Sequence, residues 1–357
     1  MESIVIVGAG FAGLCAAFHA RALGADPLII EAADGPGGAW RRMDPTMRCL
    51  SPRRYDQLPD GSTPPGTDDL ASAEEVASAL RTFADRQSFR ARYGESVSSV
   101  TRIDGGFSLH VGGETVSCRH LVAATGIAGA PRTLDLPGGA GFAGDQLPAM
   151  GLHQRVDEVG QRVLVVGAGN SGADAVRLLA WTDREVTLSS RRALASQGPW
   201  PAGAAGALKW RLSGLPIGLL PPQLRCTDTV LPVDDLLNMA VSEGAVRLVG
   251  PALRFESHGV RCAPSPGAES SPEVIVPVDT VVLATGYDRD LDWLGSLVPR
   301  DVRGAPLHRG GLVSPHLALL GLDCQRTRRS GFLRGMNEDA RAVVSTLLSH
   351  PRGAVRG

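Results

Sequence analysis

The sequence predicts an α/β protein made of two doubly wound units with parallel sheets. Two apolar runs, Ile4–Val7 and Val163–Val166, each end in a glycine-rich turn. Continuous Val, Ile and Leu runs bounded by glycine are typical of strands buried on both faces of a parallel sheet. A helical pattern and a second apolar run follow each turn, which completes a βαβ unit. Two such units in one chain predict two Rossmann-like domains.

The elements of both units can be placed from their patterns. In the first unit we expect a helix over Leu14–Leu23 and a strand over Leu28–Ile30. In the second unit we expect a helix over Ala173–Ala180 and a strand over Val186–Leu188. Outside the units, the patterns predict a helix over Ala73–Asp85, strands over Val97–Val100 and Phe107–Val116 with a hairpin turn at Gly105-Gly106, an irregular segment over Pro201–Pro222 that makes substrate or domain contacts, a surface loop over Ala263–Pro272 and a closing helix over Asn337–Leu348.

Length and composition exclude several classes of protein. The chain has 357 residues, of which 43% are hydrophobic and 20% are charged, and this suits a globular protein with two cores. The net charge of −1 predicts no nucleic-acid partner and no attraction to an anionic membrane. No run reaches the roughly 18 apolar residues of a membrane span. Because the N-terminus also lacks a basic leader, we expect a cytoplasmic protein.

The cysteines carry no recognisable motif. None of them forms a Cys-x-x-Cys pair, which argues against a disulfide framework, a zinc site and a redox dithiol. We therefore expect buried thiols at all six positions and no metal site. The six are Cys15, Cys49, Cys118, Cys226, Cys262 and Cys324.

The first glycine-rich turn has the spacing of a dinucleotide site. Gly8 allows a tight turn, Gly10 lets the backbone approach a pyrophosphate, and Gly13 lets helix and strand pack closely. Glu31 follows the second strand. A carboxylate at that place accepts hydrogen bonds from a ribose 2′-hydroxyl and repels a 2′-phosphate. The turn therefore predicts a site for FAD or NAD and not for NADP.

The second turn repeats the glycine spacing from Gly167 onward but lacks the acid. The position that corresponds to Glu31 is Ser190, and Arg191 and Arg192 follow it. Guanidinium groups there can grip a 2′-phosphate through paired hydrogen bonds. The second site is therefore predicted to take NADPH rather than NADH. The alternative is that both arginines belong to an ordinary solvated surface.

The order of these motifs resembles the bacterial flavin-containing monooxygenases, which are class B flavoprotein monooxygenases with two dinucleotide-binding domains. The matching motifs are the FAD loop at residues 8–13 with Glu31, the GGxW turn at Gly37-Gly38-Ala39-Trp40, the linker strands ending in Ala124-Thr125-Gly126 and Ala284-Thr285-Gly286-Tyr287, the NADPH loop at residues 167–172, and the last FAD-binding strand and helix at residues 321–327 and 335–340.

The resemblance implies a domain division and a set of cofactor contacts. It implies an FAD-binding domain over 1–135 and 285–357, with an NAD(P)-binding domain over 136–284 inserted into it. The implied FAD contacts are Gly8, Gly10, Phe11, Ala12, Gly13, Glu31, Ala32, Gly38, Ala39, Trp40, Val97, Thr125, Gly126, Asp323 and Gln325. The implied NADPH contacts are Gly167, Gly169, Asn170, Ser171, Gly172, Arg191, Arg192, Thr285 and Gly286.

The resemblance also implies a reaction. In this family NADPH reduces FAD, and the reduced flavin adds O2 to give a C4a-(hydro)peroxyflavin. That species oxygenates a nitrogen or sulfur atom, or a ketone in a Baeyer–Villiger reaction, while the protein binds, orients and excludes water. The expected partners are thus O2 and a small organic substrate, and a homodimer is left open.

The chain departs from the family fingerprint F-x-G-x-x-x-H-x-x-x-(Y/W). Phe142 and Gly144 are present, but Pro148 stands at the histidine position and Leu152 at the aromatic position. The nearby His153 is off register, and we expect it in a surface loop. These losses keep a second hypothesis open, an NAD(P)H-dependent flavin oxidoreductase or oxidase that releases H2O2 without oxygenating its substrate. A third hypothesis is a non-catalytic flavoprotein.

Residues 51–59 resemble the flavin-proximal stretch of the bacterial relatives. Arg53, Arg54 and Gln57 are the candidate catalytic groups at the flavin edge, and the alternative is a basic surface turn. Pro52 stands where many family members carry an asparagine near the flavin.

Overall fold

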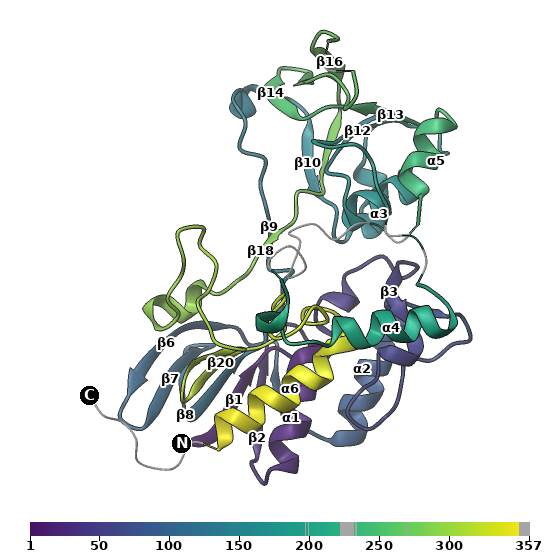
Figure 1. Ribbon diagram of the computed structural model, residues 1–357. Coiled ribbons are helices and arrows are strands. Elements are labelled where there is room, and N and C mark those ends of the chain that lie inside the picture. Colours follow the sequence, from purple (N-terminus) through teal and green to yellow (C-terminus); the bar gives the residue numbers. More distant parts are fainter. Residues whose placement is uncertain (197, 199, 222–231, 233, 269, 350–357) are drawn as a thin grey trace.

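The computed structural model describes residues 1–196, 198, 200–221, 232, 234–268 and 270–349. Two α/β domains are stacked end to end (Figure 1). The chain leaves the first domain through β9 (Ala130–Pro131) and returns through β18 (Tyr287–Asp288), and these two strands pair antiparallel. The second domain is therefore an insertion in the first, which confirms the predicted fold class.

The first domain is built on an eight-stranded sheet. Its main elements are β1 (Glu2–Val7), α1 (Phe11–Ala22), β2 (Pro27–Glu31), α2 (Ala73–Gln87), β5 (Arg90–Tyr93), β6 (Val97–Ile103), β7 (Gly106–Val111), β8 (Glu114–Ala123), β19 (Leu312–Ser314), β20 (Leu317–Leu319) and α6 (Leu333–Leu348), with a small hairpin of β3 (Arg48–Pro52) and β4 (Leu70–Ser72). The strand order is β19-β20-β8-β1-β2-β5, parallel from β20 to β5, and β7 and β6 continue antiparallel from β8. Helices α1, α2 and α6 cover one face of the sheet (Figure 1).

The second domain is a five-stranded parallel sheet with a smaller sheet on one side. Its elements are β10 (Asp145–Pro148), β11 (Arg162–Val166), α3 (Asn170–Leu179), β12 (Glu185–Ser189), α5 (Leu236–Ser242), β13 (Val246–Val249), β14 (Ala252–Glu256), β15 (Gly259–Cys262), β16 (Val274–Pro277) and β17 (Thr280–Leu283). The strand order is β10-β17-β11-β12-β13. Helices α3 and α5 pack on one face, and the antiparallel sheet β14-β15-β16 packs on the other.

The helices begin before the apolar patterns that predicted them. Helix α1 starts at Phe11 and α3 at Asn170, each directly after a glycine N-cap, so both helices reach into the glycine-rich turns. The start of α2 was predicted correctly, because Ser72 and Glu75 form a reciprocal capping box. The closing helix α6 begins at Leu333, four residues before its predicted start.

One predicted strand is wrong. The stretch Phe107–Val116 is broken by a second hairpin turn at Gly112 and Gly113, whose φ angles of 56° and 90° suit glycine. It therefore divides between β7 and β8. The predicted turn at Gly105 is present, with a φ of 77°.

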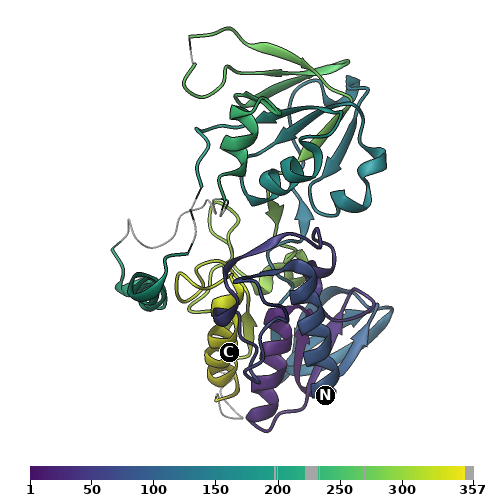
Figure 2. The same cartoon turned by 90° about the vertical axis from the view of Figure 1, so that its right-hand side faces the viewer.

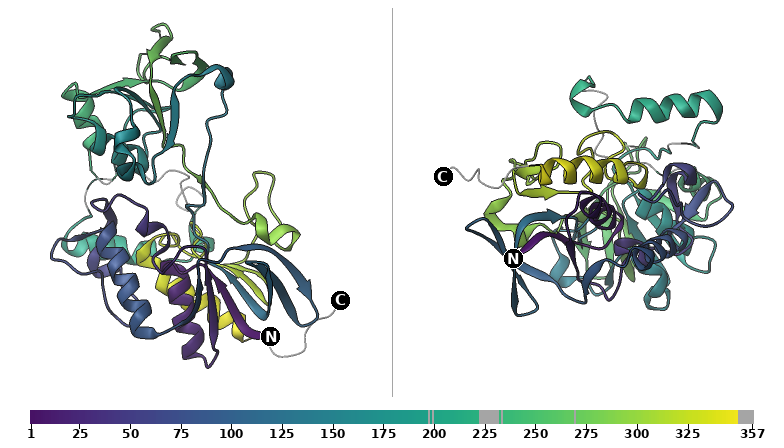
Figure 3. Two further views of the ribbon diagram at one scale, coloured as in Figure 1. Left: turned by 180° about the vertical axis from the view of Figure 1, so that it is seen from behind. Right: turned by 90° about the horizontal axis from the view of Figure 1, so that it is seen from below.

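The segment predicted to be irregular over Pro201–Pro222 forms an arm with regular structure. Residues 200–221 contain the helix α4 (Gly203–Ser213) and the 3-10 turn η6 (Ile217–Leu219), while Pro222 lies outside the described residues. The arm follows β12 of the second domain but lies along the first domain, beside α6 (Figure 3). The Ile217 amide donates a hydrogen bond to the Arg326 carbonyl at 2.9 Å. The expected contact between domains is therefore present.

Among the five described cysteines, one differs from expectation, and Cys226 lies outside the described residues. Cys15, Cys49, Cys118 and Cys262 are buried free thiols, as predicted. Cys324 is disulfide-bonded, so the expectation of six thiols is wrong there. Cysteine spacing alone does not reveal such a pairing.

Candidate cofactor and active site

The first glycine-rich turn forms a cradle that only small residues can line. Gly8 has a φ of 110°, and a Cβ atom there would collide with the Ala124 carbonyl. A Cβ on Gly13 would collide with the Gly8 carbonyl, so helix α1 can approach β1 closely. A Cβ on Gly38 would lie 3.0 Å from the Gly10 Cα, which brings the GGxW turn against the loop. The N-terminus of α1 thus faces an open backbone surface that fits a pyrophosphate.

Glu31 lies at the edge of this cradle, where the prediction placed it. Its Oε2 accepts a hydrogen bond from the Ala9 amide at 2.6 Å, and its Oε1 accepts one from the Ala33 amide at 2.9 Å. These bonds hold the carboxylate beside the turn, where it can accept further bonds from ribose hydroxyls. The Glu95 amide donates to the Glu31 carbonyl at 3.0 Å, which brings the start of β6 at Val97 to the same edge.

The GGxW turn closes the cradle from a second side. Gly37 has a φ of 127°, and its amide donates a hydrogen bond to the Ala9 carbonyl at 3.0 Å. The 3-10 turn over Gly38–Arg41 follows, and Trp40 in it packs half-buried against the core of the first domain. Ala39 is half-buried beside it, while Ala32 is exposed behind Glu31.

Residues that follow β8 and β20 complete the first site. Thr125 Oγ1 donates a hydrogen bond to the Asp290 carbonyl at 3.2 Å, and Gly126 has a φ of 84°. Asp323 forms an ion pair with Arg289 at 3.1 Å, and burial raises the pKa of its carboxyl.

Gln325 has a structural role within its own loop. Its Nε2 donates to the Leu319 carbonyl at 2.7 Å, and its Oε1 accepts from the Leu322 amide at 3.2 Å. The side-chain amide is therefore already engaged.

The second glycine-rich turn repeats the first in detail. Gly167 has a φ of 114°, and its amide donates a hydrogen bond to the Ser189 carbonyl at 3.0 Å. A Cβ on Gly172 would collide with the Gly167 carbonyl. Gly169 caps α3, and Asn170 opens it. The N-terminus of α3 is thus arranged for a second pyrophosphate.

The two arginines that follow the second strand of this unit are exposed, and no described carboxylate balances their charge. Ser190 follows β12 and is buried, and its Oγ bonds the Arg192 carbonyl at 2.7 Å. Arg191 and Arg192 are exposed, and neither forms an ion pair with a described carboxylate. Two free guanidinium groups at the end of the second strand of a βαβ unit suit a 2′-phosphate.

Thr285 and Gly286 lie where the chain returns to the first domain. Thr285 Oγ1 donates a hydrogen bond to the Arg132 carbonyl at 2.7 Å, and the Arg132 amide donates to the Gly286 carbonyl at 3.0 Å. The Tyr287 hydroxyl bonds Ser171 at the start of α3. The second site and the domain crossing are thereby connected.

The candidate catalytic side chains are mostly engaged with their own segment. Arg53 donates to the Asp68 carbonyl at 2.9 Å and pairs with Glu75 at 3.1 Å. Arg54 is exposed and pairs with Asp69 at 2.8 Å. Gln57 is exposed. These contacts tie the flavin-proximal stretch to the start of α2, so Arg53 orders this stretch.

Sequence reasoning missed Asp56, which lies in the same stretch. Its side chain has 0% exposure, its Oδ1 accepts a hydrogen bond from Ser51 Oγ at 2.7 Å, and its Oδ2 has no partner. Burial raises the pKa of the carboxyl to about 7, against the opposing effects of Ser51 and of the positive charges of Arg334 and Arg53. A buried acid with a strongly perturbed pKa is a functional candidate. No local pattern distinguishes it from an exposed aspartate.

Aromatic and cationic side chains join the arm to this stretch. Tyr55 stacks on Trp210 of α4 with 4.2 Å between ring centres and an interplanar angle of 11°. The ring centre of Trp200 lies 5.5 Å from that of Tyr55, with an interplanar angle of 48°. The Arg329 guanidinium lies 3.4 Å from the centre of the Trp210 ring, and it pairs with Glu338 of α6 at 3.0 Å.

One of the two altered fingerprint positions has become part of the second core. Leu152 is 2% exposed and packs in the core between the parallel sheet and α3, where a hydrocarbon side chain is suited. Pro148 ends β10. The expectation of a surface His153 is wrong, because the residue is half-buried. Its Nδ1 is shielded from solvent and has no hydrogen-bond partner among the described residues. The off-register histidine is therefore partly buried, in the 3-10 turn over Leu152–Gln154.

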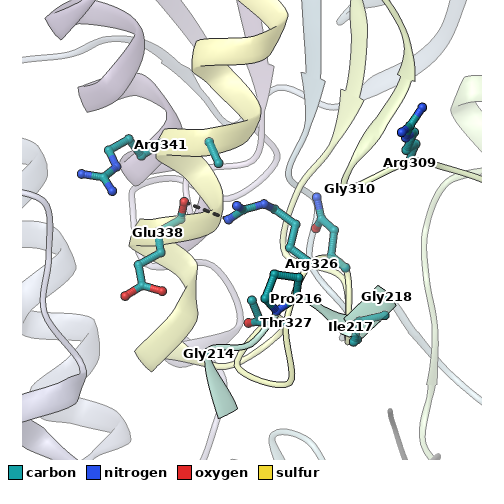
Figure 4. Close-up of a pocket in the computed structure, with 12 residues that line it drawn as sticks. Gly214, Pro216, Ile217, Gly218, Arg309, Gly310, Arg326, Thr327, Glu338 and Arg341 are labelled. Atoms are coloured by element: carbon teal, nitrogen blue, oxygen red, sulfur yellow. Dashed lines mark hydrogen bonds between the residues drawn. The ribbon is translucent and has the colours of Figure 1, made fainter. Parts of the chain in front are cut away.

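A groove of about 640 Å3 lies on the outer side of α6 (Figure 4). It is bounded by the end of the arm at Gly214–Gly218, by Arg309 and Gly310, and by Arg326 and Arg341. None of the predicted glycine-loop residues lines it. Gln325, which the resemblance implies as an FAD contact, is one of its lining residues.

Two classes of site are absent from the described part of the chain. No group of three or more His, Cys, Asp or Glu side chains in it could hold a metal ion. No helix in it has the length and apolar character needed to cross a membrane.

Comparisons with known proteins agree with this geometry. A family model described as pyridine nucleotide-disulphide oxidoreductase matches residues 5–200. The indole-3-pyruvate monooxygenase YUCCA1 of Oryza sativa subsp. japonica is 27% identical over 83% of this chain and 80% of its own length. A flavin-containing monooxygenase from Stenotrophomonas maltophilia superposes with a TM-score of 0.73 at 23% identity, over 98% of this chain and 99% of that chain.

A third relative carries both cofactors. OTEMO in complex with FAD and NADP superposes with a TM-score of 0.71 at 18% identity, over 97% of this chain and 85% of that chain. These relatives confirm the resemblance to flavin monooxygenases. Since the family model covers more than half of the chain, the protein is an oxidoreductase that belongs to the pyridine nucleotide-disulphide oxidoreductase family.

Proposed function

We propose that the protein is an FAD- and NADPH-dependent monooxygenase that transfers one oxygen atom from O2 to a small organic substrate. The observation that carries the proposal is the pair of dinucleotide cradles with opposite charge. Glu31 is held at the first by two backbone amides, and Arg191 and Arg192 stand uncompensated at the second. The named activities of the relatives support oxygenation.

The residues of the chain have separable tasks in this proposal. The N-termini of α1 and α3 bind the two pyrophosphates, Glu31 binds the FAD ribose, and the arginine pair binds the NADPH 2′-phosphate. The FAD, when bound, takes hydride from NADPH and supplies the reactive oxygen species. The stacked arm covers the flavin-proximal stretch at Tyr55, which limits the access of water.

The decisive measurement is oxygen coupling. Purified FAD-loaded protein is given NADPH, 18O2 and a panel of amines, sulfides and ketones, and both product mass and H2O2 are measured. The proposal expects 18O in one class of product, with H2O2 below the NADPH consumed. Stoichiometric H2O2 without labelled product would instead establish the alternative oxidase, which Pro148 and Leu152 at the fingerprint positions favour.

The cofactor preference has its own test. Replacing both Arg191 and Arg192 by alanine should raise KM for NADPH between tenfold and a hundredfold, because a charge-assisted hydrogen bond contributes about 1.5–3 kcal/mol. KM for NADH should stay within about twofold. Arg177→Ala is the matched control, since Arg177 is also exposed in this domain but pairs with Asp174 at 2.9 Å. Equal losses with both cofactors would contradict the assignment.

A further inference from the structure

Helix α4 turns a glycine, a tryptophan and a serine toward the protein. Gly206 is buried, Trp210 stacks on Tyr55, and Ser213 Oγ accepts a hydrogen bond from Arg329 Nε at 3.2 Å. These three positions are spaced by four and three residues, so they lie on one face of the helix. The contacts show that this face is the inner one.

The outer face of α4 carries the large apolar side chains. Leu208 and Leu212 each follow an inner-face residue by two positions, which places them about 200° around the helix axis. Their exposed fractions are 57% and 52%. Leu215 and Leu219 continue the apolar surface beyond the helix, at 39% and 76% exposure. A surface helix normally buries its aliphatic side chains, whereas α4 buries Trp210 and leaves Leu208 and Leu212 exposed.

The position of the helix leaves this surface open. Helix α4 lies at the outer edge of the molecule when the view is turned, with no other element outside it (Figure 2). The same holds when the molecule is seen from below, where α4 stands beyond α6 (Figure 3). Nothing in the described part of the chain covers the four leucines.

The charged side chains of the arm itself have one sign. Lys209 and Arg211 flank the leucine stripe and are exposed, and no Asp or Glu occurs from residue 200 to residue 221. The groove at the end of the arm adds Arg309 and Arg341, which are exposed and form no ion pair with a described carboxylate, and one acid, Glu338, which pairs with Arg329 at 3.0 Å (Figure 4). The net charge of −1 therefore hides a local basic surface.

We propose that the outer face of the arm docks on an anionic lipid surface, with the four leucines in the interface and the basic side chains against the headgroups. Exposed leucines bordered by Lys and Arg are the pattern of an element that lies in a membrane interface without crossing it. A second copy of this chain is the less suitable occupant. Twofold pairing through this face would bring Lys209 and Arg211 against their own counterparts, and like charges in contact oppose association.

The test is sedimentation of FAD-loaded protein with vesicles at 50 mM and 300 mM NaCl. Vesicles of pure phosphatidylcholine are compared with vesicles that contain 30% phosphatidylglycerol. We expect binding to the anionic vesicles that weakens at the higher salt, because each basic residue contributes a screened attraction. Absence of binding to anionic vesicles at 50 mM NaCl would overturn the proposal.

Two variants assign the binding to the arm. Leu208→Ser with Leu212→Ser should lower the partition coefficient at least tenfold, because burial of each leucine contributes well over a factor of ten. Lys209→Glu with Arg211→Glu should also lower the partition coefficient at least tenfold, because each positive charge that is removed lowers it about fivefold. An unchanged flavin spectrum shows that each variant is folded.

The matched control removes two apolar side chains at the other end of the molecule. Leu253 and Ile275 lie on the small sheet of the second domain and are 37% and 49% exposed. Serine at both positions should leave vesicle binding unchanged. If the control lowers binding as much as the arm variant, or if the leucine variant instead converts a dimer into a monomer in sedimentation velocity, the lipid assignment is refuted.

Discussion

Replacing Asp56 by asparagine should stabilise the protein most above pH 7 and progressively less as the pH falls toward 4. The carboxyl is fully buried, keeps a single hydrogen bond to Ser51, and has a pKa raised by burial from 3.8 to about 7. Between these two values the folded chain holds a proton that the unfolded chain has lost. Stability therefore falls as the pH rises through this window.

The magnitude follows from the width of the window. A shift of about three pKa units, at about 1.4 kcal/mol per unit, makes the wild type about 4 kcal/mol less stable at pH 8 than at pH 4 on account of this one group. Asparagine has nearly the same shape, can still accept the bond from Ser51, and carries no charge at any pH. The gain at pH 8 should approach this value as an upper limit.

Urea unfolding at pH 5 and at pH 8, followed by far-UV circular dichroism, measures the effect. The free energy of unfolding of Asp56→Asn should exceed that of wild type at pH 8 by about 2–4 kcal/mol, and the excess should fall to less than half of that at pH 5. Asp69→Asn is the control, since Asp69 is 64% exposed and pairs with the exposed Arg54. A variant that is less stable than wild type at pH 8 would refute the reasoning, because Asp56 would then be stabilised in its charged form.

Two further substitutions test the cradle and the arm. Glu31→Gln leaves one of two backbone amides without its carboxylate acceptor, so the Kd for FAD should rise about tenfold. A fluorescence titration of the apoprotein measures this Kd. The control is Glu114→Gln at an exposed position, which should leave the Kd for FAD unchanged. Unaltered FAD affinity would remove Glu31 from the site. Trp210→Ala removes the ring stacked on Tyr55, so trypsin should cleave the basic sites of α4 roughly tenfold faster. The control Trp181→Ala, on the second domain, should leave the cleavage rate unchanged. Equal acceleration by both variants would show that the Tyr55–Trp210 stack does not hold the arm in place.

The two βαβ units could be predicted because their determinants are local. The apolar runs, the glycine spacing and the acid or basic residues behind them are all contained within about 30 residues, which is the length of one unit. The structure places Glu31 and the Gly8 turn in contact, as the spacing predicts. The one strand that was predicted wrongly, Phe107–Val116, failed at two glycines whose positive φ angles made a hairpin turn inside an apolar run.

The active-site neighbourhood could not be predicted in the same way, because it is assembled from distant segments. Asp56 is an ordinary aspartate in the sequence, and its perturbed pKa arises from burial by the surrounding structure. From the sequence, Arg53 is expected to be a free cation. In the structure it donates a hydrogen bond to the Asp68 carbonyl and forms an ion pair with Glu75. Leu152 reads as a lost side chain and is in fact part of a core.

The sequence by itself determined the two dinucleotide cradles and their charge preference, because glycine at a positive φ and a charge at a strand end act over short distances in the chain. Only the tertiary structure decided which groups are buried and which face solvent. It sealed Asp56, engaged Gln325 within its own loop, and laid the arm on the first domain with Trp210 inside and Leu208 outside. Burial depends on neighbours that are far away in the sequence, so no local pattern encodes it.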